Sequence, residues 1–164
     1  MADQVDRIVQ GWRRERPELD VAALALLARL FRTAQLADAA LGQQLATHGL
    51  QPGWFDLLAA LRRAGAPYEL TPTQLMRTTV LSSGGMTKRL DRLTHAGLIE
   101  RRPDPTDRRG TLVRLTRRGK TTIDTLLPIH LVNEQQLLAP LSPAQQRMLD
   151  ELLRSLLAGL EPPQ

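Results

Sequence analysis

The stretch LTPTQLMRTTVLSSGGMTKRLDRLTHAGLIERRPDPTDRRGTLVRLTRRG, residues 70–119, decides the fold that we predict for this chain. Thr71-Pro72 is typical of a helix start, because threonine caps helices and proline is favoured at the first helical position. Residues 80–83 indicate the turn and cap of a second short helix, which we expect to end at Ala96-Gly97. Its buried stripe has helical spacing: Met86, Leu90 and Leu93. Two short helices joined by a tight turn predict a helix-turn-helix.

The second half of this stretch predicts a β-hairpin. Residues 98–102 and 111–115 are short runs with the composition of strands. Between them lie two prolines, two aspartates and a glycine, which are typical turn residues. Two arginines, Arg108 and Arg109, make the tip of this hairpin basic. The fold class that we predict is mainly α with a small β-hairpin, a winged helix-turn-helix.

The rest of the chain predicts helices on both sides of this region. Asp3 and Asp20 are positioned to cap helices that end near residues 16 and 47, and the second is so apolar at its start that we expect burial on more than one side. Further helices are expected over about 51–61, 116–138 and 142–160. We assign residues 71–120 to DNA binding and residues 1–70 and 116–164 to helical dimerisation, within one compact domain. The terminal apolar faces could close a single core, but two-fold symmetry favours a dimer.

Composition excludes several classes of protein. The chain has 164 residues, no cysteine and three histidines. Thiolate metal sites, disulfides and thiol-based sensing are therefore ruled out, and we expect no metal, no cofactor and no enzymatic activity, since phosphate-binding glycine motifs are missing too. The amino-terminal segment has no secretory signal pattern, and no apolar run approaches the ~18 residues of a membrane span, so a cytoplasmic protein is expected.

The positive charge is concentrated in one region. Residues 88–120 carry eleven basic and four acidic side chains, about +7, whereas the whole chain is +5. A polyanion is the natural partner of such a patch, and an arginine-rich solvated face is the alternative.

The outer face of the second short helix carries small and hydrogen-bond-donating groups. Donors at the start of such a helix suit base edges in a major groove, and a later arginine suits phosphate. Glycine costs roughly 1 kcal/mol in a helix, and a close approach to DNA would explain Gly84-Gly85. The hairpin tip could enter a minor groove with an aspartate orienting an arginine. An ordinary solvated helix and turn would tolerate the same residues. The DNA-binding candidates are Ser83, Gly84, Thr87, Lys88, Arg92, Asp107, Arg108 and Arg109.

Residues 70–119 resemble the winged helix-turn-helix of the MarR family, including the LIERR strand, the D-R-R wing and the V-x-L-T-x-x-G motif after it. The flanking helices fit the family as well, so the resemblance covers essentially the whole chain. It implies a triangular homodimer built from the terminal helices, and a pseudo-palindromic operator with half-sites about one helical turn apart. It also implies that Arg109 enters the minor groove with Asp107 behind it.

Within this family the chain resembles the urate-responsive regulators of the HucR and PecS type, which add a short amino-terminal helix bearing a tryptophan. The resemblance implies a ligand pocket of Trp12, Asp56, Arg89 and Arg101. Two guanidiniums can hold a planar oxyanion, an indole can cover it, and a carboxylate can accept ring N–H groups. Each residue also has an ordinary structural explanation, and the order Trp54-Phe55 departs from the subgroup's pattern.

These features predict a homodimeric DNA-binding regulator, a repressor, that a small anionic ligand releases from its operator. Urate or another purine is the first expected ligand, and citrate or aconitate the second. We expect the anion to disrupt an interaction of Arg89 and Arg101 with Asp56 and so to tilt the DNA-reading helix. The alternative is a basic architectural protein that binds nucleic acid without sequence preference and senses nothing.

Overall fold

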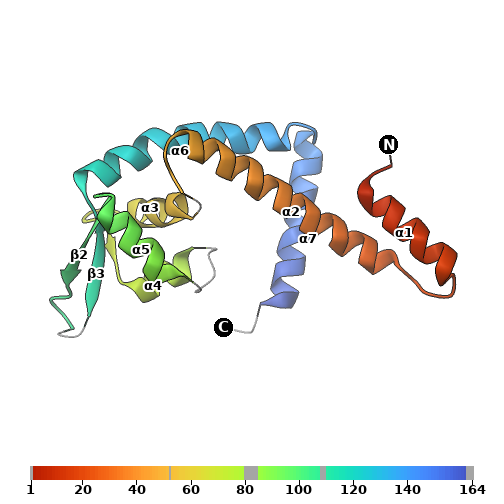
Figure 1. The fold of residues 1–164 in the computed structure, drawn as a ribbon, viewed down its shortest axis with the longest axis horizontal. Helices are drawn as coiled ribbons and strands as arrows, with labels where there is room; N and C mark the ends of the chain where they lie inside the picture. Colours follow the sequence, from red (N-terminus) through yellow and green to blue (C-terminus); the bar gives the residue numbers. More distant parts are fainter. Residues whose placement is uncertain (1, 52, 80–84, 108–109, 162–164) are drawn as a thin grey trace. The chain divides into compact units, whose positions relative to one another are not determined.

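The computed structural model describes residues 2–51, 53–79, 85–107 and 110–161. The described chain is mostly helical and contains one small sheet (Figure 1). It divides into two compact units, residues 1–44 and 45–164. None of the helices in the described ranges is long and apolar enough to span a bilayer.

The first unit contains α1 (Gln4–Glu15) and most of α2 (Ala22–Thr47). Asp3 caps α1 as predicted, because its carboxylate accepts the backbone N–H of Asp6 while the Asp6 carboxylate accepts that of Asp3. Arg29 on α2 forms ion pairs with both carboxylates, at 2.8 Å from Asp3. The small core of this unit consists of two valines of α1 and one directly before α2: Val5, Val9 and Val21.

The expectation that α2 is buried on more than one side is wrong for the single chain. Leu26 and Phe31 are 73% and 68% exposed. Among the described residues of its unit, the short helix α1 is what packs against α2, and this leaves large apolar side chains of α2 open to solvent.

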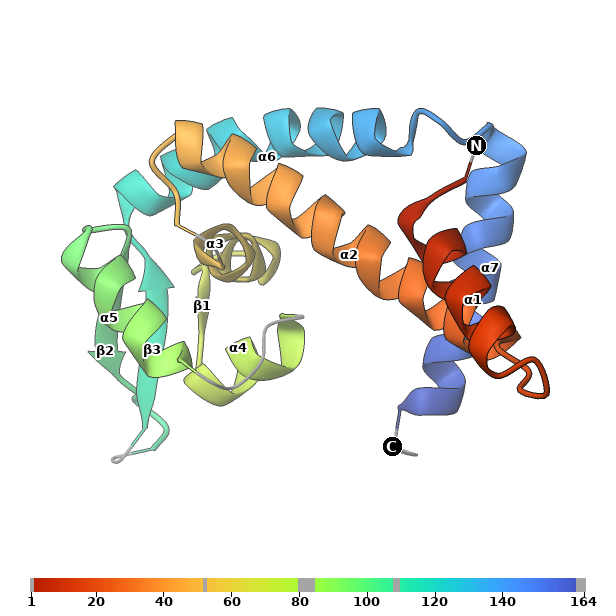
Figure 2. The same ribbon diagram turned by 45° about the vertical axis from the view of Figure 1, so that its right-hand side comes forward.

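The second unit begins with α3 (Trp54–Arg63), β1 (Glu69–Leu70), α4 (Pro72–Thr78) and α5 (Met86–His95). It continues with β2 (Ile99–Pro103), β3 (Thr111–Leu115), α6 (Arg117–Leu138) and α7 (Pro143–Leu160). The strands form an antiparallel sheet in the order β1-β3-β2. Figure 2 shows the β2–β3 hairpin running beside α5 and extending beyond its first turn. The predicted hairpin is confirmed, whereas β1, only two residues long, was not predicted.

One hydrophobic core joins α3, α4, α5, α6 and the sheet of this unit. The predicted stripe of α5 is confirmed, since Met86, Leu90 and Leu93 are buried. Fully buried side chains from α3, α4, β3 and α6 meet it: Leu57, Leu58, Leu61, Leu75, Val113 and Ile123. Residues on α3, which we assigned to the dimerisation region, therefore share a core with the helix-turn-helix. The functional division of the chain stays a prediction.

The start of α5 differs from the prediction. Gly85 occupies the cap position with φ of 84°, a left-handed conformation that glycine adopts readily, and the helix begins at Met86. We expected Gly85 to lower the stability of the helix. This expectation is wrong, because the residue lies before the helix. Gly84 lies outside the described residues. The end of the helix is as predicted, at Ala96 followed by Gly97 with φ of 69°.

The L-T-x-x-G part of the motif joins the hairpin to α6. Thr116 caps α6, because its hydroxyl oxygen accepts the N–H of Gly119 at 3.0 Å and donates to the carbonyl oxygen of Gly97 at 2.8 Å. A Cβ atom on Gly119 would lie 1.9 Å from the carbonyl oxygen of Leu98. Glycine is therefore required for α6 to approach the base of the hairpin this closely.

Candidate nucleic-acid interface and ligand site

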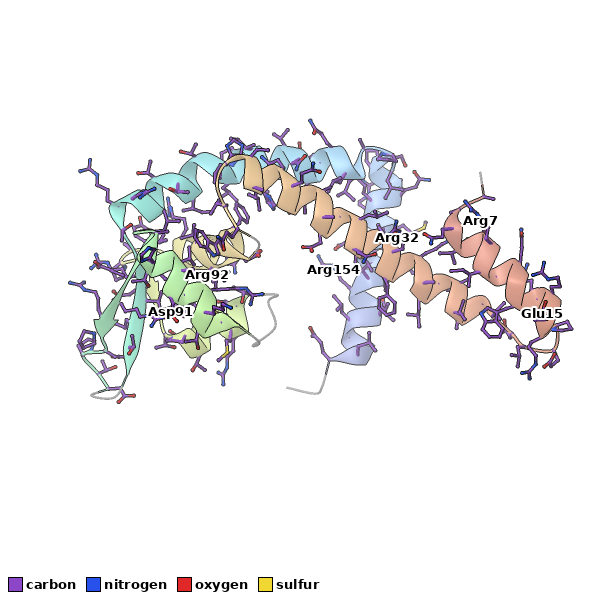
Figure 3. All side chains as sticks on the ribbon, viewed as in Figure 1. Arg7, Glu15, Arg32, Asp91, Arg92 and Arg154 are labelled. Atoms are coloured by element: carbon purple, nitrogen blue, oxygen red, sulfur yellow. The ribbon has the colours of Figure 1, made fainter. Side chains whose placement is uncertain are left out.

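The first turn of α5 presents donors to solvent. Thr87 and Lys88 are exposed directly after the left-handed Gly85, so both predicted base-reading side chains are accessible. Arg92 is exposed one turn later, and its guanidinium donates to the side-chain oxygen of Gln51 at 3.3 Å. Figure 3 labels Asp91 and Arg92 on this helix. Two other predicted DNA-binding residues, Ser83 and Gly84, lie outside the described residues.

The turn between β2 and β3 has a defined shape. The Asp104 carboxylate accepts both the backbone N–H and the hydroxyl of Thr106, at 2.8 and 2.7 Å, and the hydroxyl hydrogen bond is the main reason why the pKa of Asp104 is lowered. A Cβ on Gly110 would lie 2.8 Å from that of Asp104, so the turn also needs glycine. Asp107 is exposed and closes the turn by accepting the Gly110 N–H on its backbone oxygen. Predicted residues Arg108 and Arg109 lie outside the described residues.

Asp104 and Gly110 shape the wing, by which we mean the β2–β3 hairpin with its turn, although we had predicted both only as typical turn residues without a specific role. The signal was present, because an aspartate before Pro-Thr is typical of a turn in which the carboxylate accepts a backbone N–H two residues later. We had attributed the aspartate role in this turn to Asp107 alone.

The four predicted ligand residues lie in different places. Trp12 is on α1 in the first unit and is 45% exposed. Asp56, exposed in the first turn of α3, lies in the second unit. Arg89 lies half-buried on α5, with its guanidinium near Gly85. Arg101 is on β2.

Arg101 pairs with a carboxylate that the sequence analysis did not consider. Its Nη2 donates to Oδ1 of Asp91 at 2.7 Å, and both side chains are partly open to solvent. In the described part of the chain the carboxylate partner of Arg101 is thus Asp91, not Asp56 as we expected. The reason is packing, because α5 contacts β2 directly. This ion pair connects α5 to the wing.

A hollow of about 300 Å³ lies where α4, α5 and the hairpin meet. Its polar groups are the guanidinium of Arg101 and the hydroxyls of Thr87 and Thr111. Apolar side chains complete the lining: Pro72, Met76, Met86 and Leu90. An apolar wall with a cation and two hydroxyls suits a small amphipathic anion. No cluster of three potential metal ligands occurs within the described ranges.

Comparison with known proteins places this geometry in a family. The sequence model that describes the MarR family matches residues 48–110 of this chain. The HTH-type transcriptional regulator PecS of Dickeya dadantii (strain 3937) is 39% identical over 150 residues, which are 92% of this chain and 90% of that protein. The fold is similar to that of Sco3205, a MarR family transcriptional regulator from Streptomyces coelicolor solved in complex with DNA. That likeness has a TM-score of 0.79, 25% identity, and coverage of 88% of this chain and 91% of the other.

A second solved structure is BpsR of Bordetella bronchiseptica, whose DNA binding is regulated by 6-hydroxynicotinic acid. It matches with a TM-score of 0.71 and 26% identity over 80% of this chain and 97% of that one. The relatives are transcriptional regulators and not enzymes, and the similarity to PecS spans nearly the whole chain, as the resemblance to PecS-type regulators implied. The chain belongs to the MarR family of winged helix-turn-helix transcriptional regulators.

Proposed function

We propose that this protein is a cytoplasmic repressor that binds a pseudo-palindromic operator as a homodimer and is released by a small anionic ligand. The observation that carries the ligand response is the hollow shared by Thr87, a DNA-reading candidate, and Arg101, a ligand-binding candidate. A molecule bound there touches the DNA-reading helix and the wing together. DNA affinity and ligand affinity are then thermodynamically linked.

In the proposed complex, α5 enters the major groove by its first turn. Thr87 and Lys88 donate to base edges together with Ser83 and Gly84, and Arg92 contacts phosphate. The wing places Asp107, Arg108 and Arg109 at the minor groove. The exposure of the donors on α5 and the hydrogen-bonded turn at Asp104 support this arrangement.

The proposed homodimer is supported by apolar surface that the single chain leaves uncovered. No residue of α7 is buried within the chain, although the helix carries a continuous apolar stripe. Met148 and Leu152 are each 62% exposed. Exposed apolar surface of this extent is typical of an interaction site. Further exposed residues on α2 and α7 are Leu24, Leu26, Leu27, Phe31, Leu36, Leu149, Leu156, Leu157 and Leu160.

For the ligand we propose urate or another purine first, and citrate or aconitate second, with Trp12, Asp56, Arg89 and Arg101 as its candidate contacts. Of these four, Arg101 is the one that lines the hollow in the described part of the chain. The regulation of BpsR by a small hydroxylated aromatic acid supports the general class. The ion pair of Arg101 with Asp91 changes the expected mechanism. An anion competes with Asp91 for the guanidinium, loosens the connection between α5 and the wing, and shifts the population away from the DNA-binding arrangement.

The experiment follows release of a fluorescent operator, identified by sequencing the DNA that co-purifies with the protein. Urate should release the wild-type protein, and Arg89→Ala should raise the urate concentration for half-release at least tenfold. Arg154→Ala is the control, because Arg154 is an exposed arginine on α7 that pairs only with Asp150 in the described structure. Equal release of wild type and Arg89→Ala would contradict the pocket. Release by citrate and not by urate would contradict the purine assignment.

The same assay tests the alternative of a non-specific architectural protein. A regulator should prefer its operator over random duplex by at least ~10³ at physiological salt. Equal affinity for both duplexes, with no response to either anion, would favour the architectural protein.

A further inference from the structure

A second hollow, of about 640 Å³, lies between the turn after α2 and the first three turns of α6. His48 contributes from the turn, and Arg117 and Arg118 contribute from the start of the helix. Three hydroxyls line the same helix face: Thr121, Thr122 and Thr125. No residue is shared with the hollow at Arg101, so the two are separate places in the second unit.

The second hollow carries positive charge that nearby acids do not neutralise. Among the residues that the structure describes, none that lines this hollow carries a carboxylate. Arg117 is exposed and has no carboxylate partner among the residues that the structure describes. Arg118 donates one N–H to the carbonyl oxygen of Ala96 at 3.2 Å, which leaves most of its donors available. Asp124, an acid farther along α6, is already paired with Arg62 at 2.6 Å and Lys120 at 2.9 Å.

The position of the two arginines means that their charge lowers the stability of α6. They are the first two residues of α6, and the first turn of that helix contains no acid. The amino-terminal end of a helix is its positive end, so cations there lower helix stability. For Arg118 the hydrogen bond to the Ala96 carbonyl oxygen offsets part of this cost, and an anion that contacts both guanidiniums would offset the rest.

We propose that this hollow binds a small anion carrying two linked phosphoryl groups, such as a diphosphate ester. Guanidiniums bind phosphoryl oxygens through paired, charge-assisted hydrogen bonds, and the imidazole and hydroxyls supply further donors. The volume is in the range of small-molecule sites. The bond of Arg118 to Ala96 connects this site to the carboxyl-terminal end of α5, so its occupancy reaches the DNA-reading helix from the end opposite Thr87 and Lys88. The proposal does not depend on the urate site.

The test is calorimetric titration of the full-length protein with inorganic pyrophosphate at constant ionic strength. Wild type should bind it, Arg117→Gln should bind at least tenfold more weakly, and Arg147→Gln should match wild type. Arg147 is an exposed arginine on α7, away from the hollow, and is the matched control. Arg89→Ala should also match wild type, which separates this site from the proposed urate pocket.

Three results would overturn the proposal. The first is no pyrophosphate binding by the wild type at millimolar concentration, and the second is equal binding by Arg117→Gln and Arg147→Gln. Orthophosphate binding as tight as that of pyrophosphate would contradict the requirement for two phosphoryl groups. An operator-binding titration of Arg117→Gln distinguishes a DNA contact: a loss of operator affinity without loss of pyrophosphate affinity would assign Arg117 to the DNA backbone instead.

Discussion

At the scale of single residues, Gly119 has less room for a side chain than the other glycines whose surroundings the structure describes. Any side chain there would meet the Leu98 carbonyl oxygen, which is backbone and cannot rotate away. We expect Gly119→Ala to lower the free energy of unfolding by about 3 kcal/mol, in the upper range of overpacking. Gly159→Ala is the control, because a Cβ atom on Gly159 in α7 would meet nothing within 4 Å. Urea denaturation of both variants measures the difference, and equal midpoints would contradict the close approach.

Asp91 allows a test of how the ligand acts. If an anion competes with Asp91 for Arg101, Asp91→Ala should lower the ligand concentration needed for half-release from the operator, by up to about fivefold for a partly exposed ion pair. Asp150→Ala is the matched control, because Asp150 pairs with Arg154 at 2.8 Å on α7. An unchanged or higher concentration for Asp91→Ala would mean that breaking this pair is not part of release. Operator titration with the chosen anion gives the measurement.

At the scale of elements, the capping box of α4 holds the first helix of the helix-turn-helix at its start. The Thr71 hydroxyl accepts the Gln74 N–H at 3.1 Å, and the Gln74 side chain accepts the Thr71 N–H at 2.8 Å. Thr71→Ala should lower the free energy of unfolding by about 1 kcal/mol, and Thr71→Ser should restore most of it. Thermal and urea unfolding measure both. A serine variant as unstable as the alanine variant would show that the hydroxyl is not the source of the effect.

Elements with local signals were predictable, and those that depend on tertiary contacts were not. Caps at Asp3 and Thr71 marked helix starts that the structure confirms, because a cap is a contact between residues three apart. β1 has two residues and exists only through pairing with β3, so it left no periodic pattern. For the same reason, nothing in the spacing of the sequence indicated that Arg101 pairs with Asp91 or that Arg117 and His48 line one hollow.

At the scale of the whole molecule, ion pairs and hydrogen bonds of carboxylates make the stability of the fold decrease at acid pH. The pKa of Asp124 is lowered by its hydrogen bonds to Lys120 and Arg62, and those of Asp3 and Asp104 are lowered as well. The folded state therefore favours the carboxylates. The stability that these carboxylates contribute is fully present above their ordinary pKa of 3.8. It is lost as the pH falls through their lower pKa values in the folded state.

We accordingly expect the thermal midpoint to fall as the pH is lowered below 3.8, and Asp124→Asn to show a shallower fall. Differential scanning calorimetry across this range measures both curves. If the thermal midpoints of wild type and Asp124→Asn fell in parallel with pH, this carboxylate would contribute nothing to the loss of stability at acid pH.

The proposed dimer can be tested on α7 without destroying the chain's own core. Leu152 is 62% exposed, and none of the residues of α7 is buried within the chain, so Leu152→Glu should leave the folded protomer intact by circular dichroism. In a two-fold dimer the change occurs twice, and each leucine removed from an apolar contact costs about 1.5–3 kcal/mol. The dissociation constant should therefore rise at least about 100-fold. Glu151→Lys, an exposed change at the neighbouring position, is the control. Sedimentation equilibrium measures the association: a monomeric wild type would contradict the dimer, and an unchanged dimer of Leu152→Glu would exclude this face of α7 from the interface.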